Sequence, residues 1–341
     1  MVCSAAPSTR ALEWTPTAGP YGGVIYAFHT TDDGTTLTGT DSGEIYATRD
    51  GGASWRLVTD VLPERSVLCF LEKDGALYAG TDGRGVWRST DDGATWTNLD
   101  RVTLVNPTVR SMALFDGVMY VGTTGGLARF DEGGDYPETW TTLVGGLRNV
   151  LLRELLVVDG QLLAATHGGV YGLNAESGRW SAMNVGLMRG NGVAPMVRAL
   201  VSHAGALYAG TATQAVFRSD DAGATWVKAS NGLAPEDASD AVVNVLDLVS
   251  TGGSLIASLA GQGLYVSEDG GETWTTYGDG VPNPYANALH HVGDTVLAGT
   301  YGTGVYRRVT GAGAWSYSSE GIRDTSVFAL ASDGERLYMG G

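Results

Sequence analysis

The sequence has few cysteines, little positive charge and no long apolar run. It holds 21 lysine and arginine residues against 37 aspartates and glutamates, so its formal net charge is −16 over 341 residues. A surface of this sign repels nucleic acid and anionic membranes, which argues against both as partners. The two cysteines, Cys3 and Cys69, form no disulfide framework, and we expect neither a metal site nor a resident cofactor, because no Cys or His spacing predicts one.

No apolar stretch approaches the length of a membrane span, so we expect no membrane insertion. Residues 1–7 also lack the basic region and hydrophobic core of a signal peptide. A chain that starts at a native Met1 would be cytoplasmic, whereas a mature secreted protein given a new start codon would look the same. The compartment therefore stays open.

Glycine is abundant instead, with 51 residues, and Thr, Val and Tyr are common. Apolar residues show no sustained helical spacing, which favours short strands joined by tight turns. One sequence motif, S/T-x-D-x-G-x-S/T-W, occurs four times, at residues 48–55, 89–96, 219–226 and 267–274. The Asp accepts hydrogen bonds from the turn, the Gly permits positive φ, and the Trp supplies a large apolar surface to the next strand.

The tryptophans reveal a period that runs from one end of the chain to the other. Trp14, Trp55, Trp96, Trp140, Trp180, Trp226, Trp274 and Trp315 lie 40 to 48 residues apart, and only Trp87 stands outside the series. A fixed period of this length indicates a repeat architecture. Each period accommodates four strands, A to D, of about five residues with short turns.

We therefore predict an all-β fold, a single eight-bladed β-propeller over residues 1–341, with four-stranded antiparallel blades. The eighth blade would combine residues 327–341 with residues 1–17. This two-plus-two clasp of the chain termini would remove free sheet edges. We also expect the protein to be a monomer.

The repeated turn and its period resemble the Asp-box (BNR) repeats of β-propellers. That family includes sialidases, xyloglucanases, sortilin-type receptors and photosystem II assembly factors. The resemblance implies that Asp50, Asp91, Asp221 and Asp269 are structural and lie on the face opposite the binding site. It does not define the function, because one fold hosts many activities. The catalytic residues of sialidases have no counterpart here, and xyloglucanases carry two such propellers.

Strand A lines the central channel of such a fold, and the second residue of each copy varies in chemistry. An alignment of the eight copies gives Ile25, Leu68, Arg110, Arg153, Arg198, Asn244, Asn287 and Phe328. Three converging guanidinium groups would hold a carboxylate, sulfate or phosphate, and the apolar positions would hold a hydrophobic body. We therefore predict a ligand-binding site formed by Arg110, Arg153, Arg198, Asn244, Asn287 and Phe328.

The predicted function is non-catalytic recognition of a small anionic or amphiphilic ligand, or of a protein partner, at the loop-bearing mouth of the channel. In a simpler interpretation each Arg pairs with a neighbouring acid, such as Glu154, and only joins blades. The alternative function is that of a lyase, cyclase or glycosidase, in which His167, Tyr301 or Glu154 would handle protons. Other residues of the B–C loops at this end are Asp82, Arg84, Gln214 and Gln262. A lectin-like module is disfavoured because these loops differ from one another.

Overall fold

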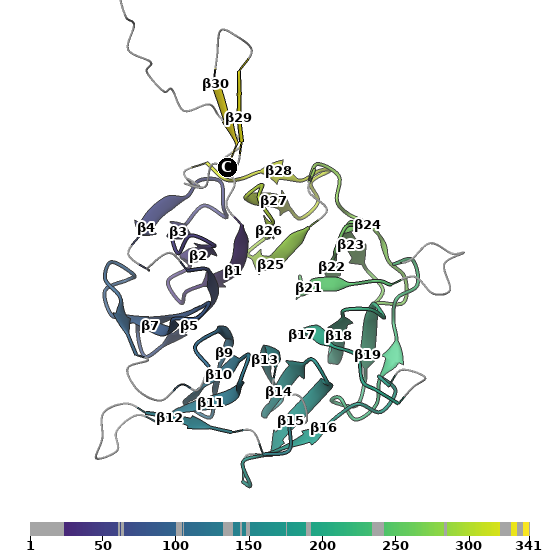
Figure 1. Cartoon of the computed structure of the whole chain (residues 1–341). Helices are drawn as coiled ribbons and strands as arrows, with labels where there is room; N and C mark the ends of the chain where they lie inside the picture. Colours follow the sequence, from purple (N-terminus) through teal and green to yellow (C-terminus); the bar gives the residue numbers. More distant parts are fainter. Residues whose placement is uncertain are drawn as a thin grey trace, which may run out of the picture.

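The computed structural model describes residues 24–60, 62, 65–99, 104, 106–131, 139–143, 145–147, 151–174, 176–188, 192–233, 242–282, 285–320, 329–332 and 337–340. These residues form strands and turns without any helix, so none of them belongs to a helix long and apolar enough to cross a membrane. Seven sheets of four antiparallel strands are arranged around a central channel, and one two-stranded sheet follows them (Figure 1). We call the four-stranded sheets blades 1 to 7 in chain order.

In each blade the chain runs from the innermost strand to the outermost, in the order predicted for strands A to D. Blades 1 and 2 contain β1 (Ile25–Thr30), β2 (Thr36–Thr40), β3 (Ile45–Thr48), β4 (Arg56–Thr59), β5 (Val67–Lys73), β6 (Ala76–Thr81), β7 (Gly85–Ser89) and β8 (Thr97–Asn98). Blades 3 and 4 contain β9 (Val109–Phe115), β10 (Val118–Thr123), β11 (Gly126–Asp131), β12 (Thr139–Thr142), β13 (Leu152–Val158), β14 (Gln161–Thr166), β15 (Gly169–Asn174) and β16 (Arg179–Ala182). Blades 5 to 7 contain β17 (Val197–His203), β18 (Ala206–Thr211), β19 (Val216–Ser219), β20 (Val227–Lys228), β21 (Val245–Ser250), β22 (Leu255–Leu259), β23 (Gly263–Ser267), β24 (Thr275–Thr276), β25 (Ala286–Val292), β26 (Thr295–Thr300), β27 (Val305–Val309) and β28 (Ser316–Tyr317).

The prediction of eight blades is wrong, because the ring closes with seven. The innermost strand of blade 7, β25, packs directly against β1 of blade 1, as every other inner strand packs against the next. Gly299 of β26 faces Ile25 and Phe28 of β1, which leaves no space for a further blade between them. The last two strands, β29 (Ala329–Ser332) and β30 (Leu337–Gly340), form a hairpin outside the ring (Figure 1).

The clasp of the chain termini therefore does not close the ring. Strands β29 and β30 are the two C-terminal strands expected for it, and they pair with each other as predicted. The expected N-terminal contribution, residues 1–17 with Trp14, lies outside the described residues. The closure instead rests on the contact between blades 7 and 1.

The tryptophans that begin the fourth strands of blades 1, 5, 6 and 7 repeat one contact. Trp226 Nε1 donates a hydrogen bond to the Met183 carbonyl of the preceding blade at 2.9 Å. Trp274 and Trp315 do the same with the blades before them. Trp55 of blade 1 donates to the Ser318 carbonyl of blade 7 at 2.7 Å, so the contact between neighbouring blades also joins the first blade to the last.

The four aspartate turns connect the third and fourth strands of blades 1, 2, 5 and 6. In blade 5, Asp221 Oδ1 accepts a hydrogen bond from Thr225 N at 2.8 Å, and Oδ2 accepts one from Thr225 Oγ1 at 2.6 Å. Ser219 Oγ donates to Oδ1 and accepts a hydrogen bond from Gly223 N, whose φ is 90°. Asp50, Asp91 and Asp269 make the same contacts. These turns lie at the end of the strands opposite the B–C loops.

Glycine on the second strand lets neighbouring blades approach closely. A Cβ atom placed on Gly39 of β2 would lie 2.5 Å from Val67 Cβ and 3.3 Å from Phe70 of the next blade. A Cβ on Gly210 would lie 2.6 Å from Val245 Cγ1 in the same way. The cores between blades combine aliphatic side chains from neighbouring blades with tryptophans such as Trp274.

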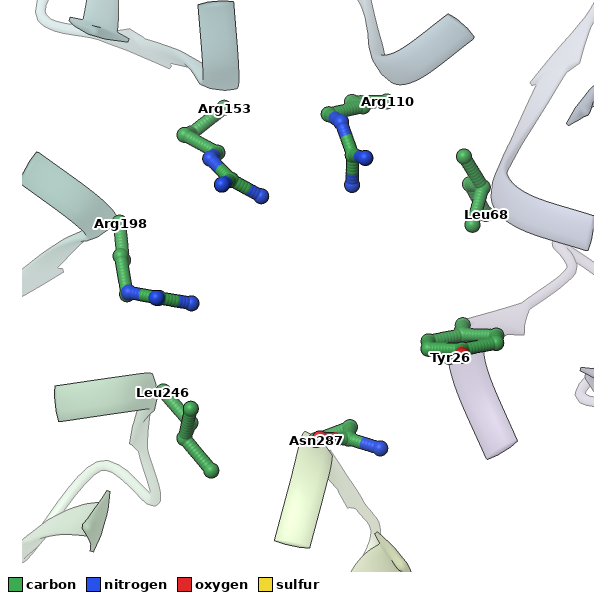
Figure 2. Close-up of a pocket in the computed structure, with 7 residues that line it drawn as sticks. All are labelled: Tyr26, Leu68, Arg110, Arg153, Arg198, Leu246 and Asn287. Atoms are coloured by element: carbon green, nitrogen blue, oxygen red, sulfur yellow. The ribbon is translucent and has the colours of Figure 1, made fainter. Parts of the chain in front are cut away.

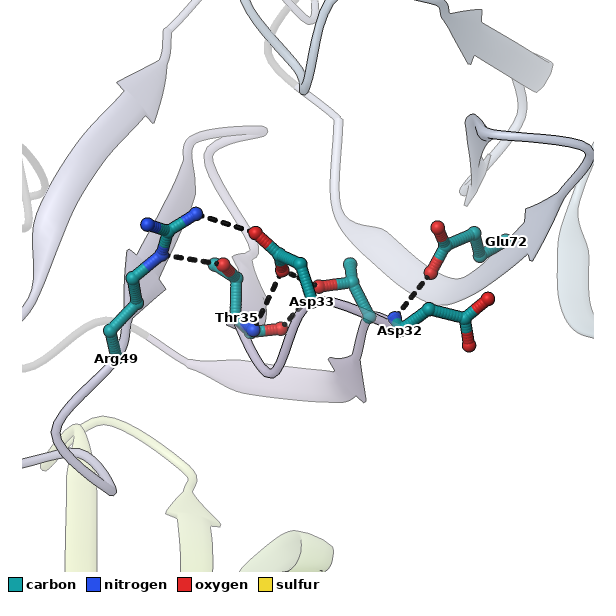
Figure 3. Close-up of polar contacts among 6 residues, drawn as sticks. Asp32, Asp33, Thr35, Arg49 and Glu72 are labelled. Carbon is teal, nitrogen blue, oxygen red and sulfur yellow. Dashed lines mark hydrogen bonds and ion pairs between the residues drawn. The ribbon is translucent and has the colours of Figure 1, made fainter.

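Polar contacts join blades at the end that carries the aspartate turns (Figure 3). Asp33, in the turn between β1 and β2, pairs with Arg49 of the same blade and accepts a hydrogen bond from Thr35 N. Asp32 N donates to Glu72 Oε2 of blade 2 at 2.9 Å. Arg49, Asp33 and Glu72 thus have protein partners in Figure 3, and the hydrogen bond to Glu72 joins blades 1 and 2.

Candidate functional site

Every inner strand contains a β-bulge at the same place. The pairing between the first two strands of each blade skips the second residue of the inner strand, for example Arg153 between Leu152 and Glu154. Register shifts at the equivalent position occur in the six other blades. A bulge leaves one residue without a partner on the facing strand and redirects its side chain. Here the bulged residues surround the channel.

The seven bulged residues line one cavity of about 200 Å³. Figure 2 shows their side chains arranged in a ring, with the three guanidinium groups directed toward the centre. In blade order the ring is Tyr26, Leu68, Arg110, Arg153, Arg198, Leu246 and Asn287. Ligand pockets for drug-sized molecules are usually larger, about 300–1,000 Å³. The volume therefore suits a single small group or a chain end.

The structure places four of the six predicted site residues in this ring: Arg110, Arg153, Arg198 and Asn287. Asn244 lies two residues before the bulge of blade 6, where Leu246 is found instead. Tyr26, not the aligned Ile25, lines the cavity in blade 1, and Ile25 is completely buried between blades. Phe328 lies outside the described residues.

A signal in the sequence could have located the bulge. Val67 and Phe70 of β5 both pack against Gly39 of the preceding blade, although they are three residues apart. In a regular strand such residues point to opposite faces. Val245 and Leu248 show the same arrangement on Gly210. An apolar pair at this spacing therefore marks the first of the two residues between its members as the one directed into the channel, and it identifies Tyr26 and Leu246.

The three arginines of the ring have no carboxylate partner among the described residues, where the ion pairs involve other side chains. Burial and then the charges of Arg110 and Arg198 lower the pKa of Arg153 to about 10. Burial and then Arg110 lower the pKa of Arg198. Like charges that are partly removed from water destabilise one another, so an anion bound between them would be stabilised strongly.

Two donor atoms of the ring are buried without a hydrogen-bond partner in the described part of the chain: Arg198 Nε and Asn287 Nδ2. Leaving a buried donor unpaired costs about 1–3 kcal/mol. Both atoms belong to side chains that line the cavity from blades 5 and 7. A ligand with acceptor oxygens would provide partners for them.

A second tier of residues lies above the ring, where each inner strand begins. In every blade the residue two positions before the bulge accepts a backbone hydrogen bond from the residue that follows the second strand, as Leu151 accepts one from His167 at 3.1 Å. The corresponding donors in blades 1, 2 and 7 are Asp41, Asp82 and Tyr301. Of the predicted catalytic candidates, His167 and Tyr301 thus belong to the same tier but lie in blades 4 and 7.

His167 reaches down from this tier to the arginine ring. Its Nε2 accepts a hydrogen bond from Arg153 Nε at 3.1 Å, which requires the neutral imidazole. Burial first, and then the charges of Arg153, Arg198 and Arg110, lower the pKa of His167. Tyr26 lies on the other side of the cavity, where burial and then the carboxylate of Asp41 raise its pKa. The mouth therefore has a cationic side in blades 3 to 5 and an acidic side in blades 1 and 2.

Glu154, the third catalytic candidate, does not pair with an arginine in the described structure. Its Oε2 accepts a hydrogen bond of 2.6 Å from Leu200 N in the next blade. Asp247 occupies the equivalent position of blade 6 and accepts one from Leu289 N at 2.6 Å. Burial and then Asp247 raise the pKa of Glu154 to about 8, and burial raises that of Asp247 to about 7. These two carboxyl groups join blades beneath the ring.

Among solved structures, the chain is similar to the GH74 xyloglucanase from Xanthomonas campestris, with a TM-score of 0.72, 18% identity and coverage of 96% of this chain and 59% of that one. The extracellular domain of the putative one component system BT4673 from B. thetaiotaomicron gives a TM-score of 0.68 at 18% identity. That match covers 95% of this chain and 44% of the other, so the chain spans less than half of that protein. YCF48 bound to D1 peptide gives a TM-score of 0.66 at 17% identity, with coverage of 89% and 99%.

At these identities the solved structures support the fold alone. No curated protein matches the sequence. The model of the DUF6242 beta propeller domain matches residues 20–250, which is more than half of the chain. Together with the seven four-stranded blades, this match shows that the chain belongs to the DUF6242 β-propeller domain family.

Proposed function

We propose that this propeller is a non-catalytic binding module that holds the carboxylate of a ligand, in particular the carboxy-terminal end of a partner polypeptide, in the arginine ring. One observation carries the proposal: Arg110, Arg153 and Arg198 converge on one cavity and have no acid partner among the described residues. In a protein of net charge −16, three such cations in one place favour an anionic ligand. Tyr26, Leu68 and Leu246 supply an apolar surface beside them.

Two further points support a chain end as the ligand. The cavity of about 200 Å³ accommodates one terminal residue but not a large ligand. A structural neighbour, YCF48, was solved bound to D1 peptide, which is a property of that protein.

We also propose that the aspartate turns are Asp-box elements, as the sequence resemblance implies. Both oxygens of these carboxylates accept hydrogen bonds within the turns. We therefore place the binding site at the opposite end of the strands, where the arginine ring lies.

The enzymatic alternative has less support from the geometry. His167 Nε2, the atom that would take a proton, already accepts a hydrogen bond from Arg153. Glu154 is bonded to the backbone of blade 5, and Tyr301 belongs to blade 7 and is 60% exposed. A general base must be within hydrogen-bond reach of the proton that it removes. These three residues therefore do not form one catalytic group.

Calorimetric titration with N-acetyl-L-alanine tests the proposal, and N-acetyl-L-alanine amide is the uncharged comparison. The wild type should bind the acid and not the amide. Arg153→Ala should weaken binding by about 10–100-fold, since hydrogen bonds to charged groups contribute roughly 1.5–3 kcal/mol. The melting temperature should stay the same or rise, because a repulsive charge is removed. Arg179→Ala, at an exposed position of β16, is the matched control.

Equal binding of acid and amide would contradict the proposal, as would unchanged affinity in a variant that lacks all three arginines. A large loss of stability in Arg153→Ala would instead assign this side chain to blade packing. The same comparison can be followed by thermal shift, since a ligand that binds only the folded state raises its stability.

A further inference from the structure

The arginine ring carries more positive charge than one carboxylate can balance. Arg110, Arg153 and Arg198 come from three successive blades and line the same cavity. Their guanidinium groups occupy one arc of the ring and are directed toward its centre (Figure 2). The ion pairs of the described residues involve none of the three. A ligand with a single carboxylate would therefore leave two positive charges without a counterion.

The three guanidinium groups also act on one another. Burial first, and then the charges of Arg110 and Arg198, lower the pKa of Arg153. Burial and then Arg110 do the same to the pKa of Arg198. Repulsion between charges that are partly removed from water is screened less than at an exposed surface. Each negative charge that a ligand brings relieves part of this repulsion, so a second one adds to the affinity.

The side chains around the arc determine where a second negative charge can bind. His167 accepts a hydrogen bond from Arg153 Nε at 3.1 Å, so it is neutral and adds no fourth cation. On the other side of the cavity, burial and then charges that include Asp41 and Asp82 raise the pKa of Tyr26. A carboxylate would be repelled on that acidic side. Both negative charges of a ligand would therefore bind within the arginine arc.

The order of the ring favours two joined carboxylates over a compact dianion such as phosphate. Leu68 comes directly before Arg110, and Leu246 directly after Arg198, so an apolar side chain lies at each end of the arc. The charge itself is spread over three blades. Methylene groups that connect two carboxylates would pack against the leucines, whereas phosphate has no apolar part.

Resting on the proposed function, we infer that the ligand is a polypeptide whose last residue is aspartate or glutamate. Its α-carboxylate and its side-chain carboxylate both bind among Arg110, Arg153 and Arg198. Arg153 is the middle group of the arc, and its donors are shared between the two carboxylates. Guanidinium groups suit this role, because their planar set of donors matches a carboxylate. Chain ends with a neutral last residue bind more weakly.

Three probes of nearly the same shape test this inference. N-acetyl-L-glutamate carries both carboxylates, N-acetyl-L-glutamine only the α-carboxylate, and N-acetyl-L-isoglutamine only the side-chain carboxylate. At pH 7.5 all of these carboxyl groups are ionised. The wild type should bind the dicarboxylate about 5–50-fold more tightly than either amide, since hydrogen bonds between charged groups are roughly twice as strong as neutral ones. Titration calorimetry at one ionic strength measures the ratios.

The double variant Arg110→Gln/Arg198→Gln leaves one cation in the arc, so the preference for the dicarboxylate should fall to roughly twofold or less. Its melting temperature should be unchanged or higher, because two mutually repelling charges are removed. Arg84→Gln is the matched control. It removes a positive charge from the exposed loop between β6 and β7, at the same end of the propeller but outside the cavity lining, and should keep the full preference.

The outcomes separate this inference from the proposed function. If glutamate and glutamine probes bind equally in an arginine-dependent way, the acidic last residue is refuted and the carboxylate site stands. If no probe binds, or if the isoglutamine probe binds as tightly as the dicarboxylate, both proposals are refuted. A preference that survives in the double variant, or tighter binding of inorganic phosphate than of N-acetyl-L-glutamate, would refute this inference.

Discussion

At the scale of single residues, the channel separates groups that bind from groups that join blades. The bulged residues point into the cavity, whereas the residue that follows each bulge turns toward the next blade. Glu154 and Asp247 occupy this second position and accept backbone hydrogen bonds there. The prediction that Glu154 handles protons came from its residue type, but its contacts belong to the blade interface.

The raised pKa of Glu154, about 8, predicts a pH dependence of stability. The unfolded carboxyl has a pKa near 4.3, so the folded state binds more protons between about pH 4 and 8, and stability falls as pH rises through this window. Glu154→Gln keeps an acceptor for Leu200 N and removes the titration. It should stabilise the protein at pH 8 by roughly 1–3 kcal/mol and flatten the pH profile.

Urea unfolding at pH 5, 6.5 and 8 measures this effect. Glu176→Gln, an exposed position in the turn before β16, is the control and should leave the slope unchanged. A variant Glu154→Gln that loses stability at every pH would show that the ionised carboxylate is the favourable form.

At the scale of elements, the aspartate turn was predictable because all of its contacts are local. The residues that donate to Asp221 lie within four positions of it, so their spacing in the sequence already specifies the turn. The bulge was missed for the opposite reason. It depends on which face of the inner strand packs against the neighbouring blade, as Val67 and Phe70 pack on Gly39.

The turns should be responsible for part of the acid sensitivity of the fold. Hydrogen bonds from Thr225, and then from Ser219, lower the pKa of Asp221 to about 2, and the pKa of Asp269 is also about 2. The stabilisation is present above the unfolded pKa near 3.9 and is lost as pH falls toward 2. In Asp221→Asn the melting temperature at pH 7 should fall, and its decrease between pH 4 and 2 should become shallower.

Differential scanning calorimetry across this range provides the measurement. Asp159→Asn is a suitable control, since Asp159 lies in a turn with φ of 48°, a conformation that Asn also adopts. If the melting temperature of Asp221→Asn falls as steeply between pH 4 and 2 as that of the wild type, this turn does not contribute to the acid sensitivity.

At the scale of the whole molecule, the number of blades depends on closure. The spacing of tryptophans counts repeats along the chain, but it does not say whether the terminal repeat enters the ring. Trp55 donates to Ser318, which lies 263 residues away, in the same way as Trp226 donates to Met183 of the blade before it. This contact makes blades 1 and 7 neighbours and leaves the hairpin β29–β30 outside (Figure 1).

Ring closure predicts that Trp55→Phe and Trp226→Phe lower the free energy of unfolding by similar amounts. Each variant loses one buried hydrogen bond and part of a buried side chain, which should cost about 1–3 kcal/mol in urea unfolding. Trp87→Phe is the control, because Trp87 Nε1 has no partner among the described residues and only volume is lost. A Trp55→Phe variant as stable as the wild type would contradict the contact between blades 7 and 1.

The sequence by itself determined the propeller class, the four-stranded repeat, the aspartate turns and the presence of arginines in three successive inner strands. All of these follow from local spacing, which is written directly in the chain. Only the tertiary structure decided that seven blades close the ring, that Tyr26 and Leu246 replace Ile25 and Asn244 in the cavity, and that Glu154 joins blades. Those outcomes depend on how one blade packs against the next, and that packing joins residues far apart in the chain.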